Sequence, residues 1–375
     1  MFFSEKHLEA FRTHAARCNN VLNGVHEGCS PYNTSKERSK WGIDDEYGGI
    51  TGTIVPKDIL RVARVLVTGK TDEQPGKSPE LGAEYRLRHG ESIFCDIGCG
   101  TGRPSSYFAS LGLRCSMGFD VDSLQVLNSM AGYNKLLQQR VGFNCPVTFF
   151  KQDALALETL DPVTHVYSFI GKSLRPCRRI VNELTIRLGY PNFAYAVARL
   201  VAETKTLKVL VAVVLRTAEL IETGLIECMF EHDVIVLPGM RMSAGNSYLG
   251  FVIPINEERR RRVKQTLRAL IQNRFNKVDQ EAEKSGREMF TCATSNRKHS
   301  LTAEVYAALA LGPNKALQLG DDPSDRRRPL RACRRTLLNE PENDESSSQT
   351  ERIIKRERLA TISPSKRSRR SGDSS

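Results

Sequence analysis

Short unbroken apolar runs alternate with stretches of helical spacing along most of the chain. The apolar runs predict buried β-strands over residues 92–97, 114–119, 147–150, 164–169, 207–215, 233–237 and 247–255. Helical spacing predicts helices over residues 105–111, 123–137 and 178–204, and a charged helix over residues 257–273. Because strands joined by crossover helices form parallel sheets, this order predicts an α/β fold with a mostly parallel seven-stranded sheet.

The two ends of the chain have a different texture. An amphipathic helix is predicted over residues 5–23, and a second helix follows Pro56; near the other end, residues 301–311 favour one more helix. From Asp321 onward Arg, Lys, Ser, Asp and Glu dominate, which predicts disorder. The predicted organisation is an N-terminal helical arm (1–40), the α/β domain (41–275), a partly helical extension (276–320) and a disordered basic tail (321–375).

The segment IFCDIGCGTGRP joins the first predicted strand of the α/β domain to a glycine-rich loop. Asp96 lies near the strand end, and Gly98, Gly100 and Gly102 follow at alternate positions. Glycine permits a sharp turn with positive φ and close approach of the backbone to a ligand. A dinucleotide site has the spacing GxGxxG, whereas here the spacing is DxGxGxG with an acid that can hold a cationic amino-acid group, directly or indirectly.

Two further acids follow the next two predicted strands. Asp120 lies at the end of the second strand, where an acidic side chain can receive ribose hydroxyls, and Asp153 follows the third. The set of three acids and three glycines resembles motif I and its neighbours in Rossmann-like class I methyltransferases. That resemblance implies S-adenosyl-L-methionine as cofactor, with Asp153 near its adenine amino group. The alternative is a structural turn flanked by surface aspartates.

Three segments resemble the disruptor-of-telomeric-silencing family of non-SET histone H3 lysine methyltransferases, in its kinetoplastid-like branch. In EYGGITGTIVPKDI, Tyr47, Gly48 and Thr51 match the loop that closes over the methionine end of the cofactor, with Gly49 in place of the family's glutamate. The segment THVYSFIGKS keeps only Phe169 of an Asn-Asn-Phe run, since Tyr167 and Ser168 replace the asparagines. The segment LPGMRMSAGNSYLGFVIPI resembles a late hairpin whose Ser-Tyr pair maps onto Ser247 and Tyr248.

This resemblance implies transfer of a methyl group to a lysine in the globular core of histone H3. The residues that it places around the lysine channel are Tyr47, Phe169 and Tyr248 as walls and Ser168 and Ser247 as polar contacts. Alignment of the amine with the methyl group supplies most of the acceleration in such a reaction, so neither a metal nor a dedicated base is expected. The alternative is that the aromatic residues belong to the core and the serines to turns.

The charge distribution adds an expectation about partners. The formal net charge is +12, and basic clusters gather in DRRRPLRACRR and in KRERLATISPSKRSRR near the end of the chain. In the second stretch a basic pair, nine residues and a basic cluster fit a two-part nuclear import signal. The tail therefore predicts a nuclear protein that binds nucleosomal DNA through this tail, although a solvated tail without function is the alternative.

Other classes of protein are disfavoured by the sequence. The ten cysteines have no paired CxxC spacing, no apolar run approaches the roughly 20 residues of a membrane span, and charges occupy the N-terminal stretch where a signal peptide is apolar. Two other functions stay open: a class I methyltransferase acting on RNA or a small molecule, and a catalytically silent chromatin-binding module. No (N/D)PPY-type run follows the fourth strand, and the oligomeric state is left open.

Overall fold

The computed structural model describes residues 2–26, 54–71, 79–170, 192–214, 225, 228, 231–241, 247–269 and 299–318. The strands are β1 (Ile93–Ile97), β2 (Cys115–Asp120), β3 (Val147–Lys151), β4 (His165–Ile170), β5 (Val209–Val214), β6 (Ile235–Arg241) and β7 (Ser247–Pro254). The helices are α1 (Glu5–His26), α3 (Pro56–Thr68), α4 (Arg103–Phe108), α5 (Ser123–Gln138), α7 (Asn192–Glu203), a helix over residues 257–269 and α10 (Thr302–Leu311). Short 3₁₀ turns are η1 (Ala83–Tyr85), η2 (Ala109–Leu111) and η3 (Ala154–Ala156).

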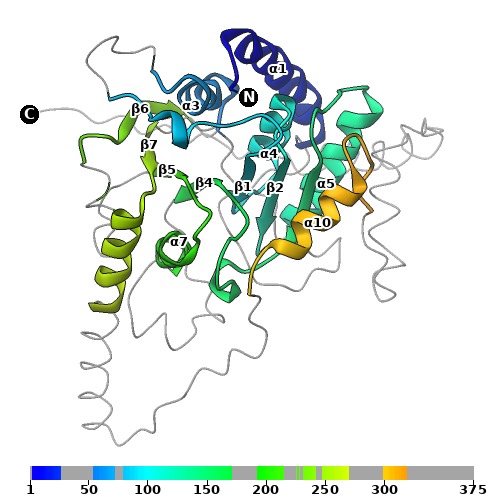
Figure 1. Ribbon diagram of the computed structural model, residues 1–375. Coiled ribbons are helices and arrows are strands. Elements are labelled where there is room, and N and C mark those ends of the chain that lie inside the picture. Colours follow the sequence, from blue (N-terminus) through cyan, green and yellow to red (C-terminus); the bar gives the residue numbers. More distant parts are fainter. Residues whose placement is uncertain are drawn as a thin grey trace, which may run out of the picture. The chain divides into compact units, whose positions relative to one another are not determined.

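The seven strands form one sheet in the order β3-β2-β1-β4-β5-β7-β6 (Figure 1). The strands from β3 to β5 pair in parallel, and β7 pairs antiparallel with both β5 and β6. This order confirms the predicted fold class, a Rossmann-like sheet of the class I methyltransferase type. The order reverses direction at β1, between β2 and β4, and ligands of open α/β sheets bind outside the carboxyl ends of the strands at such a point.

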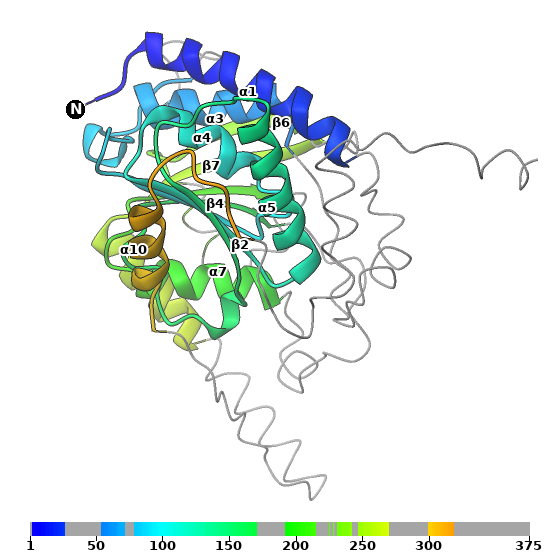
Figure 2. The same cartoon turned by 90° about the vertical axis from the view of Figure 1, so that its right-hand side faces the viewer.

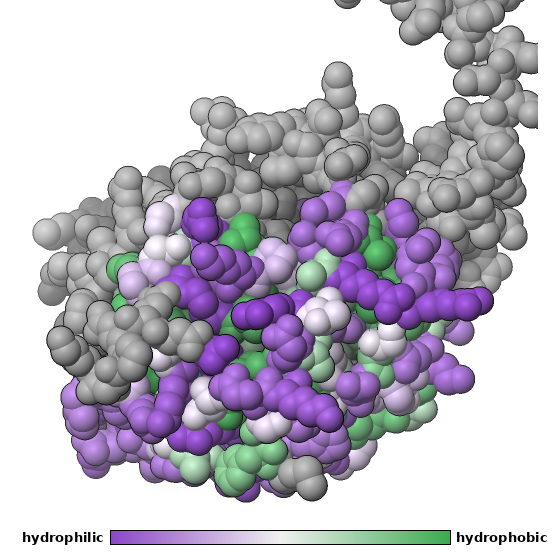
Figure 3. Space-filling model, turned by 90° about the horizontal axis from the view of Figure 1, so that it is seen from above, coloured by the Kyte–Doolittle hydropathy of each residue, from purple (hydrophilic) through white to green (hydrophobic). Residues whose placement is uncertain are grey.

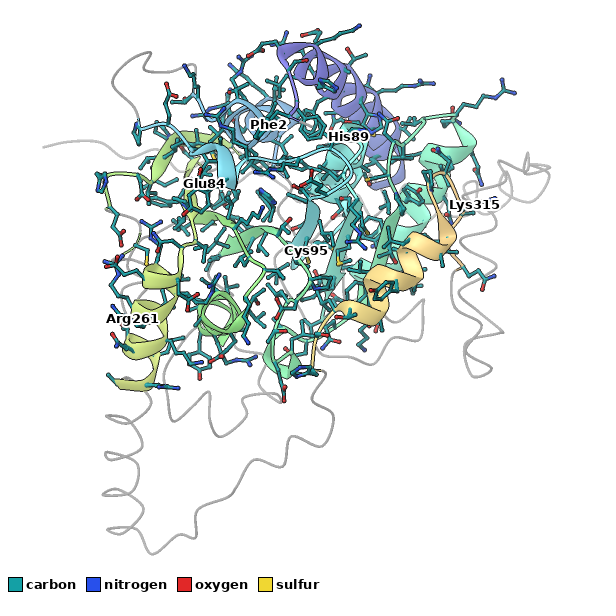
Figure 4. The ribbon with its side chains drawn as sticks, in the orientation of Figure 1. Phe2, Glu84, His89, Cys95, Arg261 and Lys315 are labelled. Carbon is teal, nitrogen blue, oxygen red and sulfur yellow. The ribbon has the colours of Figure 1, made fainter. Side chains whose placement is uncertain are left out.

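Helices cover both faces of this sheet. Alternate residues of each strand enter two separate apolar cores, so that Phe94 packs on one side of β1 and Cys95 on the other. The first core contains side chains of α1, α3, α4 and α5, and the second contains those of α7, α10 and the helix over residues 257–269. Figures 1 and 2 show α1, α3 and α4 on one side of the sheet and α7 on the other. Figure 4 labels Cys95 on β1.

Helix α3 is defined by its local sequence. Pro56 occupies its first turn, where a missing amide hydrogen costs nothing, and Gly69 ends it in the left-handed conformation with φ 81°. The face with Ile59, Val62 and Leu66 is fully buried in the first core. Its placement carries Asp58 into the interior beside the sheet, where this carboxylate is 3% exposed.

Helix α1 packs on α3, α4 and α5, and polar contacts fix it above the start of α4. The guanidinium of Arg103 donates to Oδ1 of Asn19 at 2.5 Å and to Oδ1 of Asn23 at 3.0 Å. His14 Nε2 lies 3.2 Å from the carbonyl oxygen of Ser106. The predicted boundaries between arm, domain, extension and tail stay predictions, and residues 321–375 lie outside the described residues.

A buried arginine holds the helix over residues 257–269 against the sheet edge. The fully buried Arg259 donates to Glu231, to Asp233 Oδ1 at 2.6 Å and to the carbonyl oxygen of Pro254. The two carboxylates precede β6 and the carbonyl ends β7, so one side chain joins three segments. Because a buried charge is costly without partners, these contacts are what makes its position tolerable.

His165, the first residue of β4, predicts a pH dependence of stability. Its ring is completely buried, with Nε2 2.9 Å from the carbonyl oxygen of Tyr85 and Nδ1 2.9 Å from Oγ1 of Thr164. Burial lowers the pKa of His165 to about 4 from its usual 6.5, so the folded state keeps this ring neutral at neutral pH. Below the unfolded pKa only the unfolded state binds the proton, and stability falls as the pH drops, by about 1.4 kcal/mol per unit.

The difference in unfolding free energy between the native chain and His165→Gln should therefore shrink by roughly 1 kcal/mol per pH unit between pH 6.5 and pH 5. Denaturant titrations across this range measure the difference. As a control, the m-value should not change with pH, which shows that the same unfolding transition is measured at each pH. A difference that stays constant over the whole range contradicts the assignment of a neutral buried His165.

Candidate functional site

The glycine loop after β1 has a backbone that only glycine adopts easily. Gly98, Gly100 and Gly102 all have positive φ, at 72°, 53° and 70°. The amides of Gly98 and Cys99 both donate to the carbonyl oxygen of Phe119 at 2.9 and 3.0 Å, which holds the loop against the end of β2. The observed backbone thus confirms the prediction that glycine is needed at these positions for a turn with positive φ.

Gly102 also has no room for a side chain. A Cβ added there would lie 2.5 Å from the ring of Phe149 and 3.0 Å from Cβ of Ser129. Helix α4 starts at the next residue, so any displacement of Gly102 would move both the loop and the start of this helix. The loop is therefore fixed from both sides, by β3 through Phe149 and by α5 through Ser129.

Asp120, at the end of β2, braces the same loop. Its Oδ2 accepts the amide of Gly100 at 3.0 Å, and its Oδ1 accepts the amide of Asp122 at 2.9 Å. Asp122 in turn caps α5 by accepting the amide of Leu124 at 2.9 Å. The amide of Gln152 donates to the carbonyl oxygen of Asp120, which brings Asp153 to the same edge of the sheet. The three predicted acids, Asp96, Asp120 and Asp153, thus lie at the carboxyl ends of three neighbouring strands, while their contacts to a cofactor stay predictions.

Asp96 is the most unusual polar group of this edge. It is 2% exposed, and its Oδ2 has no hydrogen-bond partner among the described residues. Burial, and secondly the charge of Asp120, raise the pKa of Asp96 well above its usual range. An unpartnered buried carboxyl is costly, so this position is suited to a ligand that brings hydrogen-bond donors and positive charge.

A small pocket opens beside Asp96 at the carboxyl ends of β1 and β4. The residues that line it come from the loop, the two strands and the segment before α3: Ile54, Asp96, Gly98, Cys99, Thr101, Pro104, Tyr167 and Phe169. The sequence predicts Phe169 as a site residue but not Tyr167. Alternation along β4 was the available signal, since residues two apart on a strand share a face.

The predicted channel residues do not all lie together. The rings of Phe169 and Tyr248 meet edge to face, with centroids 5.1 Å apart, and both pack in the first core. Ser168 lies on the opposite face of the sheet, where it is fully buried and its Oγ is 3.5 Å from the carbonyl oxygen of Ile97. Ser247 precedes Tyr248 on β7 and is exposed, so strand alternation also turns it to the opposite face. The structure therefore brings the two aromatic residues together and separates both serines from them.

The remaining predicted residues, Tyr47, Gly48 and Thr51, lie outside the described residues. Within the described ranges, no three His, Cys, Asp or Glu side chains are arranged to hold a metal ion. The helices described here include none that is long and apolar enough to cross a membrane.

The chemistry of this edge fits S-adenosyl-L-methionine. Gly98 of the positive-φ loop lines the pocket, and the unpartnered Asp96 carboxyl complements the ammonium group of an amino acid. Asp120 and Asp153 follow the two neighbouring strands, on the side where the ribose and adenine of such a ligand are expected. When bound, this cofactor supplies an electrophilic methyl group on a sulfonium.

Comparisons with known proteins give weak likenesses. No family model matches the chain, and no curated protein matches it in sequence. Among solved structures, a human methyltransferase 10 domain containing protein is 12% identical, with TM-score 0.34, over 63% of this chain and 98% of that one. An rRNA methylase from Streptococcus thermophilus is 12% identical, with TM-score 0.30, over 45% and 91%. TrmK from M. capricolum, in complex with S-adenosyl-homocysteine, is 9% identical, with TM-score 0.29, over 47% and 70%. The assignment of the class I methyltransferase fold therefore rests on the strand order of this chain itself.

Proposed function

We propose that this chain is an S-adenosylmethionine-dependent methyltransferase. The observation that carries the proposal is the unpartnered, buried carboxyl of Asp96 beside a loop of three positive-φ glycines, at the point where the strand order reverses. A chromatin module without activity would have no use for such a carboxyl, which is costly in the core unless a ligand satisfies it. A silent module is thus the less supported alternative.

We further propose a lysine of the histone H3 core, on nucleosomes, as the acceptor. The support is the resemblance of the three flanking segments to the disruptor-of-telomeric-silencing family, together with the net charge of +12. The charge fits RNA equally well, so methylation of RNA stays the second candidate. The basic clusters after residue 321 support a nuclear location and contact with DNA phosphates.

The residues around the pocket can prepare an amine for methyl transfer. A lysine ammonium attacks only after it loses a proton, and an apolar environment favours the neutral amine. Phe169, Tyr248 and Ile54 supply apolar surface next to the pocket, and Ile54 is 2% exposed. These side chains exclude water and orient the acceptor nitrogen, which is the larger share of catalysis in a reaction that needs alignment.

Incubation with radiolabelled S-adenosylmethionine and, in parallel, nucleosomes, free histones and total RNA tests the acceptor. We expect label in histone H3, most strongly on nucleosomes because the basic tail increases contact with DNA. Electrophoresis and mass spectrometry of the labelled band identify the modified residue. Label in RNA alone contradicts the histone assignment, and failure of the native chain to bind S-adenosylmethionine in a calorimetric titration favours the silent module.

Gly102→Ala should weaken cofactor binding by more than tenfold. The new Cβ meets the Phe149 ring at 2.5 Å, and the positive φ adds about 1–2 kcal/mol of strain, so the loop must move. The matched control is Gly90→Ala, where φ is +69° and nothing lies within 4 Å of the added Cβ. This control should lose about 1–2 kcal/mol of stability but bind the cofactor normally. Calorimetric titration measures the cofactor affinity of the two variants. Equal affinities in Gly102→Ala and Gly90→Ala refute the role of the glycine loop in cofactor binding.

Removal of residues 321–375 should reduce the salt dependence of nucleosome binding. Each phosphate contact by Lys or Arg adds about 0.9 to the slope of log affinity against log salt concentration on duplex DNA. We expect a flatter slope for the shortened chain in electrophoretic titrations between 50 and 200 mM salt, with cofactor affinity as the control. The same slope in both chains removes the DNA-contact function of the tail.

A further inference from the structure

Two buried polar atoms without partners approach the pocket from neighbouring strands. Asp96 on β1 and Tyr167 on β4 are paired in the parallel register, so their side chains leave the sheet on the same face. Both residues line the pocket, Tyr167 is 3% exposed, and neither Asp96 Oδ2 nor Tyr167 Oη has a hydrogen-bond partner among the described residues. Two such groups side by side are stronger evidence for one ligand site than either is alone.

The surrounding groups are acidic or already engaged. Asp58 of α3 acts electrostatically on Tyr167, and its two oxygens accept from Arg61 Nη1 at 3.0 Å and from the amide of Arg241 at 2.8 Å. Asp120 accepts two backbone amides of its own neighbourhood. No cation in the part of the chain that the structure describes donates to Asp96 Oδ2 or to Tyr167 Oη. The pocket therefore presents two oxygen acceptors to which no described cation donates, which disfavours an anionic group and favours a cation with several donors.

We propose that Tyr167 is a specificity-determining residue which, together with Asp96, forms a two-acceptor cradle for the primary ammonium of the cofactor's amino-acid end. This inference rests on the proposed function. The ammonium has three N–H donors, so it can bind the carboxylate and the phenolic oxygen at once. The phenol stays protonated, because burial, and after it the charges of Asp96 and Asp58, raise the pKa of Tyr167 well above its usual range.

The carboxylate of the same amino-acid end is a poorer occupant of this cradle. It would lie beside the carboxyl of Asp96, on which the charge of Asp120 also acts, and no described cation donates to Asp96 Oδ2 or to Tyr167 Oη. The acceptor amine is the other cationic group of the reaction, and the edge-to-face pair of Phe169 and Tyr248 offers it an apolar surface instead. The amino group of the cofactor is thus the occupant that the charges favour.

Calorimetric titration of the full chain with three ligands tests this cradle in Tyr167→Phe. S-adenosylhomocysteine carries both ends of the amino acid, decarboxylated S-adenosylmethionine keeps the amino group alone, and 5′-methylthioadenosine lacks both. The contact that Tyr167→Phe removes is a hydrogen bond to a charged group. This variant should therefore bind the first two ligands roughly tenfold or more weakly and bind the third with unchanged affinity. The matched control is Tyr133→Phe, a buried tyrosine of α5 that packs on Phe143 outside the pocket and should bind all three ligands normally.

Each other result overturns the inference in a recognisable way. Equal weakening of all three ligands shows a structural role for the hydroxyl, and loss confined to S-adenosylhomocysteine shows that Tyr167 binds the carboxylate. A raised KM for the methyl acceptor with unchanged cofactor affinity assigns Tyr167 to the acceptor instead. If the native chain itself binds none of the three, the proposed function fails; if the native chain and Tyr167→Phe bind all of them equally, only the cradle fails.

Discussion

The parallel pairing of β1 with β4 is the constraint on which the site depends. It aligns Asp96 with Tyr167 and Ile97 with Ser168, residue for residue, at the carboxyl ends of the two central strands. Because β2 lies on the other side of β1, the glycine loop leaves β1 over the end of β2, where the Phe119 carbonyl and the Asp120 carboxylate hold it. A change in this register by one residue would turn Tyr167 to the opposite core and leave Asp96 beside apolar side chains.

The free-energy cost of the polar groups buried at the site is offset by the apolar burial in the rest of the sheet. β1 and β5 are buried along their full lengths, and both cores close around them. Outside this interior, the surface seen in Figure 3 is predominantly hydrophilic, in keeping with the exposed Lys6, Arg12 and Arg17 of α1. Among the buried polar atoms without partners, Asp96 Oδ2 and Tyr167 Oη belong to residues that line the pocket, where a ligand can satisfy them, and the cost of burying them becomes part of the affinity for that ligand.

Much of the fold could be predicted from the sequence, because its strongest signals are local. The apolar run over residues 92–97, the glycine spacing after it and the helical spacing over residues 123–137 each act over a few residues. The family resemblance implies Ser168 and Ser247 as channel residues, whereas alternation along each strand sets them on the face opposite the aromatic residue beside them. Alternation along β4 sets Tyr167 on the same face as Phe169, but its place beside Asp96 follows only from the strand order, since no local pattern carries the identity of a neighbouring strand.

Helix α1, which is far from the glycine loop in sequence, contacts the start of α4 directly after this loop. Arg103 directly follows the last loop glycine, and its guanidinium, 8% exposed, bonds to Asn19 and Asn23 of α1. A buried guanidinium without these oxygens would be strongly destabilising, so the position of α1 and that of the loop are coupled through one side chain. The same helix packs its Phe11 ring on Phe108 of α4, with centroids 5.3 Å apart. Polar and apolar contacts thus act in the same direction, and α1 stabilises the loop conformation that exposes Asp96 to the pocket.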